Sequence, residues 1–151
     1  MVQIREAIPS DAKQIVDFQL KMAMETENLE LNTSIVEPGV HAVFQDKTRG
    51  RYYVAVADGQ VVGSLLTTYE WSDWRNGTIL WIQSVFVDAQ YRGKGVYRHM
   101  YSYIKEMVEN HSDEYKGIRL YVDKTNETAQ HVYQKLGMID HHYDMYEWMN
   151  D

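Results

Sequence analysis

Cysteine is absent from this chain of 151 residues. Without it, the protein can form no disulfide, no thiolate metal site and no cysteine nucleophile. The six histidines are scattered through the sequence without cysteine partners, so the sequence predicts no metal site. A chain of this length can bury roughly 70% of the surface that its unfolded form exposes. We therefore expect a single domain over residues 1–151 that folds without a disulfide or a metal.

Long apolar runs and an excess of positive charge are also missing. No run approaches the ~20 residues of a membrane span, and the first residues are too polar for a signal peptide. We therefore expect a soluble, cytoplasmic protein. The net charge of −7 argues against binding to nucleic acid or to an anionic membrane. It suits a cationic substrate, although many soluble proteins are equally acidic.

Hydrophobic periodicity and turn residues predict a mixed α/β fold in the order β-α-α-β-β-β-α-β-α-β. The second helix is expected to begin at Glu37-Pro38, since proline is tolerated in a first turn, and to end at Gly50. Asp11 and Gln14 resemble a capping box at the start of the first helix. The expected elements are strand 2–7, helix 11–25, helix 37–49, strands 52–57, 60–69 and 78–87, helix 96–111, strand 118–122, helix 126–136 and strand 143–149.

The most informative segment, residues 85–97, runs from a strand through a loop with two glycines into a helix. Gly93 and Gly95 allow a tight turn and a close approach of the backbone to a ligand. Successive amides at a helix start bind anions, and Arg92 and Lys94 add positive charge. The Walker pattern is absent from the segment. The dinucleotide fingerprint fails because Arg98 stands where its third glycine would be. The segment suits a pyrophosphate, with an ordinary glycine turn as the alternative.

The pattern Gln90-x-x-Gly93-x-Gly95 resembles the coenzyme A pyrophosphate loop of the GCN5-related N-acetyltransferase (GNAT) family. The next strand and helix resemble the downstream coenzyme motif of that family, with Asn126, Ala129 and Tyr133 at the matching positions. The resemblance covers almost the whole chain and is weakest over residues 26–50. It implies a GNAT-like single domain in which a bulged strand ending at Val87 splays from its parallel neighbour and holds acetyl-CoA in the gap.

The resemblance also implies a role for each matching residue. Backbone groups near Val85 and Val87 would bind the pantetheine arm, and Tyr133 would direct its hydroxyl at the thioester sulfur. Asn126 is equally suited to cap a helix, and a buried core tyrosine is the alternative for Tyr133. The implied coenzyme-binding residues are Val85, Phe86, Val87, Gln90, Arg92, Gly93, Lys94, Gly95, Val96, Tyr97, Asn126, Ala129 and Tyr133.

Acetylation of an amine makes three chemical demands. The amine, whose pKa is near ~10.4 when lysine-like, must lose a proton; the oxyanion needs a donor; and the thiolate leaves more easily when protonated. A backbone N–H near Val85 can be the donor, and Tyr133 can be the acid. We expect Glu70 to be the base, with Glu25, Glu27, Glu30, Asp73 or a chain of water molecules as alternatives.

Residues 69–75 combine aromatic and acidic side chains. Trp71 and Trp74 beside carboxylates are suited to hold an ammonium group; packing of the hairpin or a dimer contact is the alternative. The expected substrate residues are Glu25, Glu27, Glu70, Trp71 and Trp74.

The sequence thus favours an acetyltransferase that moves an acetyl group directly from acetyl-CoA to a primary amine of a small molecule or peptide. An acyl-CoA sensor without turnover is the alternative, and a nucleotide-binding α/β domain is a third reading. The resemblance further implies a homodimer. Fold analogy does not choose the acceptor amine.

Overall fold

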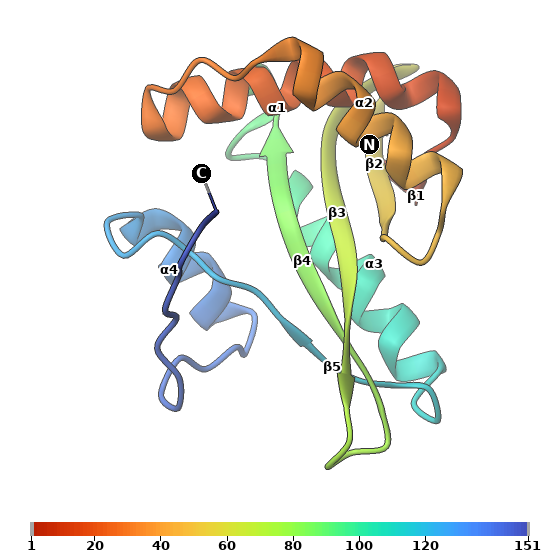
Figure 1. Ribbon diagram of the computed structural model, residues 1–151, viewed down its shortest axis with the longest axis vertical. Helices are drawn as coiled ribbons and strands as arrows, with labels where there is room; N and C mark the ends of the chain where they lie inside the picture. Colours follow the sequence, from red (N-terminus) through yellow and green to blue (C-terminus); the bar gives the residue numbers. More distant parts are fainter. Residues whose placement is uncertain (1, 151) are drawn as a thin grey trace. The chain divides into compact units, whose positions relative to one another are not determined.

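The computed structural model describes residues 2–150 (Figure 1). The chain divides into two compact units, of which the first ends at Arg119 and the second begins at Leu120. Within residues 2–150, no helix is both long enough and apolar enough to cross a bilayer.

The first unit is built on a five-stranded sheet whose strands lie in chain order. Neighbouring strands are antiparallel as far as β4, and β5 runs parallel to β4. Tight turns make this order possible, since Asp58 and Gly59, between β2 and β3, both have positive φ angles, as a two-residue hairpin turn requires. The strands are β1 (Gln3–Glu6), β2 (Arg51–Ala57), β3 (Gln60–Ser72), β4 (Gly77–Val87) and β5 (Tyr115–Arg119). The expected mixed α/β fold is confirmed.

Helices cover both faces of this sheet (Figure 1). Tyr52 and Tyr53 are adjacent in β2, so their side chains point to opposite faces. The ring of Tyr52 packs against Phe44 of α2 (Thr33–Gln45), whereas the ring of Tyr53 packs against Tyr103 of α3 (Val96–Asn110). Helix α1 (Ala12–Glu27) packs beside α2 and shares its core. That core contains Ala12, Ile15, Val16, Val40, Tyr52 and Val54.

Two expectations about helix starts are wrong. Helix α2 begins at Thr33, because the Asn32 side chain caps it by accepting a hydrogen bond from the Ser34 amide at 3.0 Å, and Pro38 therefore lies inside the helix. The expected capping box between Asp11 and Gln14 does not form either, because the Asp11 side chain caps no amide of α1. Its carboxylate faces backwards, accepting two hydrogen bonds from the Arg5 guanidinium at 2.8 and 3.1 Å and one from the Ile8 amide at 2.8 Å. Asp11 thus ties β1 to the turn that enters α1.

The second unit contains the helix α4 (Glu127–Lys135). Leu136 ends it, and Gly137 follows with a φ of 87°, as expected for a glycine in a left-handed helix cap. Residues 120–122, expected to continue the preceding strand, lie outside β5, which ends at Arg119. The closing strand expected over residues 143–149 is also not formed, since residues 138–150 are in neither helix nor strand.

Candidate functional site

A bulge interrupts β4 near its carboxyl end. On one side of it Gln83 pairs with Leu66, and on the other Phe86 pairs with Ser64, so Ser84 and Val85 together face the single residue Leu65. Ser84 has a φ of 52°, which is uncommon for a residue other than glycine and costs conformational energy. Such bulges bend a strand and are frequent beside active sites.

Beyond the start of β4, one edge of the strand is unpaired. Strand β5 pairs with β4 only from Thr78 to Trp81, and no other described strand pairs with that edge up to Val87. The Asp88 amide bonds the Val62 carbonyl at 2.8 Å. Because alternate residues of a strand direct their backbone groups to opposite sides, Val87 directs its N–H and C=O to the unpaired edge. The unpaired edge is where the splay was expected, but β5 itself pairs with β4 up to its last residue, Arg119, so the splay stays a prediction.

The loop after β4 leads directly into α3. Asp88 starts it by accepting a hydrogen bond from the Gln90 amide at 3.1 Å, and Gly93 and Gly95 have φ angles of 75° and 79°. Gly95 is the N-cap of α3, so the first amides of a helix of 15 residues have no partner within it. A Cβ at Gly93 would lie more than 4 Å from every atom beyond its chain neighbours, which leaves open space beside the loop. An anion fits here.

The two basic side chains of the loop differ in direction. Arg92 turns back: its Nη2 lies 2.6 Å from Glu25 Oε2 of α1, and its Nε donates to the Val87 carbonyl at 2.8 Å. The Lys94 ammonium lies over the Tyr91 ring, 5.4 Å from its centre. Glu25, expected in the acceptor pocket, and Arg92, expected on the coenzyme, are thus an ion pair.

The other expected coenzyme residues of the first unit fall into two groups. Phe86 and Val96 are buried, and the Phe86 ring packs on Phe18 of α1 with centres 4.9 Å apart, so only their backbone can meet a ligand. Gln90 is exposed, and Tyr97 is half-buried beside Tyr101.

Glu70, the expected base, is engaged on both oxygens. The Trp81 indole donates to one and Arg119 to the other, each at 2.7 Å, and these hydrogen bonds hold the pKa of Glu70 below its ordinary value. Glu70 pairs with Ile79 of β4, well before the bulge. At ~3.3 Å per residue, Ile79 is about 20 Å from Val85 along the strand. A weakly basic carboxylate at this distance is poorly placed to deprotonate an amine beside the bulge.

The aromatic hairpin does not form the expected cage. Trp71 follows Glu70 within β3, so the two side chains point to opposite faces of the sheet. Trp74, in the turn, is 89% exposed. Trp71 pairs with Thr78, which at ~3.3 Å per residue is about 23 Å from Val85 along β4. Both tryptophans are therefore remote from the bulge.

A polar pair that the sequence pattern did not single out lies closer to the bulge. Gln83, immediately before Ser84, donates from Nε2 to Thr68 Oγ1 at 2.5 Å, and both side chains are partly exposed. With Glu70, Trp81 and Arg119 they form a row that we call the polar strip. Its signal in the sequence is weak: polar residues at alternate positions of β3 and β4.

The second unit contains the remaining expected residues, all on α4. The Asn126 side chain caps this helix by accepting a hydrogen bond from the Ala129 amide at 3.1 Å, as the alternative assignment predicted. Tyr133 is half-buried on the same helix.

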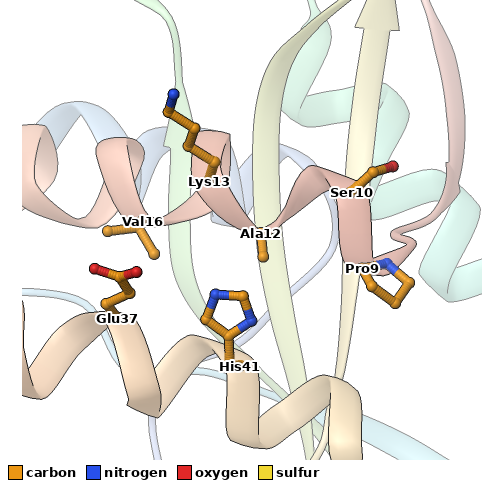
Figure 2. A pocket seen from close by; sticks show the side chains of 7 residues that line it. All are labelled: Pro9, Ser10, Ala12, Lys13, Val16, Glu37 and His41. Carbon is orange, nitrogen blue, oxygen red and sulfur yellow. The ribbon is translucent and has the colours of Figure 1, made fainter.

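Two hollows of the first unit lie away from the edge of β4. One, of ≈ 340 Å³, lies between α1 and α2. There, Glu37 and His41 of α2 point toward Val16 and Ala12 of α1 (Figure 2). No expected site residue lines it. The other, of ≈ 530 Å³, lies beside the loop and includes Gln90. In residues 2–150, no group of three or more histidine, aspartate or glutamate side chains could hold a metal ion.

Comparisons with known proteins agree with this geometry. The family model described as acetyltransferase (GNAT) family matches residues 20–138. A possible acetyltransferase from Clostridium difficile 630 is 41% identical, with 100% of this chain and 99% of that chain covered and a TM-score of 0.91. No curated protein sequence gives a significant match.

Two more distant structures share the fold. A predicted acetyltransferase with acetyl-CoA from Clostridium acetobutylicum is 18% identical, with 99% and 96% of the two chains covered and a TM-score of 0.75. A ribosomal-protein-alanine N-acetyltransferase from Brucella melitensis biovar Abortus 2308 is 15% identical, with 99% and 100% covered and a TM-score of 0.80. Given the family match over most of its length, the chain belongs to the GNAT acetyltransferase family.

Proposed function

We propose that this protein, acting as one domain over its whole length, transfers an acetyl group from acetyl-CoA directly to a primary amine of a small molecule or peptide. One observation supports this more than any other: the bulged, unpaired edge of β4 runs straight into the glycine loop and the start of α3. An extended amide-containing arm suits the edge, and a diphosphate suits the loop.

The residues fit the coenzyme in chemistry and in space. Backbone groups of Val85 and the N–H of Val87 would bind the pantetheine arm as a neighbouring strand would, while the Val87 carbonyl already accepts a hydrogen bond from Arg92. The amides from Gly93 to Tyr97 and the Lys94 ammonium would bind the diphosphate, where no Cβ occupies the space over Gly93. From the second unit, we assign Asn126, Ala129 and Tyr133 to the coenzyme on the family resemblance.

Acetyl-CoA, when bound, supplies the acetyl group as a thioester. The Val85 N–H, in the bulge, would stabilise the negative charge that develops on the thioester oxygen. Tyr133 would donate its hydroxyl proton to the departing sulfur. With no cysteine in the chain to accept the acetyl group, direct transfer is the simplest route.

The acceptor amine must arrive uncharged. Glu70 is a weak base on β3, far from the bulge, so we do not assign it to proton removal. Gln83 and Thr68 lie next to the bulge and can orient a water molecule that takes the proton to solvent. A cytoplasmic location and a homodimer stay predictions.

The test is a coenzyme A release assay against a panel of primary amines, beside calorimetric titration with acetyl-CoA. We expect turnover with at least one amine class, and Tyr133→Phe should lower kcat about 10²-fold to 10⁴-fold while the Kd for acetyl-CoA changes less than about twofold. Tyr103→Phe, on α3, is the matched control and should keep kcat. Binding without release for every amine would favour the sensor instead, and an unchanged kcat in Tyr133→Phe would remove the acid assignment.

A further inference from the structure

Arg92 of the glycine loop is held by three different partners. Its Nη2 pairs with Glu25 of α1 at 2.6 Å, and its Nε bonds the Val87 carbonyl at 2.8 Å. The guanidinium also lies over the Phe86 ring, 5.3 Å from the ring centre. Its charge is therefore directed to α1 and to the end of β4 rather than over the loop.

Phe86 extends this arrangement into the core. It is 5% exposed and packs on Phe18 of α1, which is itself fully buried. An isolated ion pair at this degree of exposure, 46% for the Arg92 side chain and 44% for the Glu25 side chain, contributes little by itself. Here, the planar guanidinium contacts the Val87 carbonyl through Nε, the Phe86 ring through its face and Glu25 through Nη2. A lysine ammonium cannot make these three contacts at once. The three contacts together fasten the loop to α1.

Lys94 is in a different situation. It forms no ion pair within residues 2–150, and its ammonium rests over the exposed side of the loop at Tyr91. The loop thus contains one cation that is already neutralised and one that is not. A diphosphate on the loop amides would meet the second.

We propose that Glu25 is a positioning residue for acetyl-CoA. It holds Arg92 on β4 and α1, away from the diphosphate, so that the loop keeps the conformation that binds coenzyme and Lys94 serves as its phosphate-binding cation. This inference rests on the proposed function, because it presumes that the loop binds coenzyme A.

The opposite assignment, in which Arg92 contacts the diphosphate directly, predicts an effect of opposite sign. If Arg92 contacts phosphate, Glu25→Gln releases the guanidinium and removes a nearby negative charge, so coenzyme A should bind more tightly. If Glu25 positions Arg92, the same change loosens the loop, and coenzyme A should bind more weakly. Arg92→Lys separates the two assignments again, because it keeps the positive charge but cannot make the three contacts together.

The experiment is calorimetric titration of the full chain with coenzyme A, with steady-state kinetics beside it. We expect Glu25→Gln and Arg92→Lys each to raise the Kd about threefold or more, and the double variant to be within about twofold of either single variant. Lys94→Gln should raise the Kd independently and add to the effect of Glu25→Gln. Asp17→Asn, which removes the same charge from the exposed Asp17–Lys21 pair of α1, is the control and should change the Kd less than about twofold.

Kinetics distinguishes positioning of the coenzyme from a general loss of structure. In Glu25→Gln, the KM for acetyl-CoA should rise with the Kd while kcat at saturation stays within about twofold. A lowered or unchanged Kd in Glu25→Gln, wild-type affinity in Arg92→Lys, or additive single effects would each overturn the inference. If the folded wild-type chain does not bind coenzyme A at all, the proposed function itself fails.

Discussion

The left-handed backbone at Ser84 gives the sharpest test of the bulge. With a φ of 52°, the backbone of this serine is strained by roughly 1–2 kcal/mol, a strain that a glycine would not have. Ser84→Gly removes this cost but adds about 0.5–1 kcal/mol of chain entropy in the unfolded state, so the free energy of unfolding should rise by about 0–1.5 kcal/mol. Ser84→Val places a β-branched side chain where φ is positive and should lower it by about 2 kcal/mol.

Urea denaturation and thermal melting measure the difference between these two variants. A gap of about 2–3.5 kcal/mol corresponds to roughly 4–14 °C in Tm for a chain of this size. Thr78→Val, a β-branched exchange in the same strand without a positive φ, is the control and should stay within about 1 kcal/mol of the wild type. We also expect Ser84→Val to lower kcat/KM at least about tenfold, because the amide of Val85 loses its orientation. If Ser84→Val were as stable as Ser84→Gly, residue 84 would not be left-handed.

Two further predictions concern carboxylates. Burial alone would raise the pKa of Asp11, but hydrogen bonds from Arg5 and the Ile8 amide outweigh it and hold the pKa below its ordinary value; Asp11→Asn should therefore cost about 1–2 kcal/mol at pH 7. Since the pKa is depressed in the folded state, this stability exists above the ordinary pKa of ~3.9 and is lost as the pH falls through the folded value. The urea curves of the wild type and Asp11→Asn should therefore be separate at pH 7 and approach each other at pH 3; an equal separation at both pH values would contradict the assignment. Glu70→Gln should keep the acidic limb of the pH profile of kcat/KM, because hydrogen bonds from Trp81 and Arg119 make Glu70 a weak base; disappearance of that limb would restore Glu70 as the base.

The elements around the loop could be predicted because local signals there agree with one another. The Asp58–Gly59 hairpin, the strand ending at Val87 and the helix from Val96 were expected at nearly the positions the structure gives. In each case, turn residues and hydrophobic period point to the same element. The start of α2 was predicted at Glu37-Pro38, because proline is common in a first helical turn. The helix instead begins after the Asn32 cap and contains Pro38 in its interior.

The bulge and the ion pairs could not be predicted in the same way. A serine at position 84 is ordinary in a strand, and only the pairing of Gln83 with Leu66 and Phe86 with Ser64 shows the extra residue. The Glu25–Arg92 pair joins residues 67 apart in the sequence, so it depends on how α1 lies over the sheet. The sequence shows that Arg92 and Lys94 are charged, but only the tertiary structure shows that Arg92 is paired with Glu25 while Lys94 lies over the Tyr91 ring.

Under the proposed function, the unpaired edge of β4 would make the stability of this protein depend on the supply of acetyl-CoA. Bare strand edges invite pairing with other chains, whereas an arm bound along Val85 and Val87 would occupy the edge. A ligand at one hundred times its Kd adds about 2.7 kcal/mol to the free energy of unfolding. We therefore expect preparations stripped of coenzyme to aggregate at lower temperature than loaded ones, so that metabolic scarcity of the acetyl carrier would shorten the lifetime of the enzyme as well as slow it.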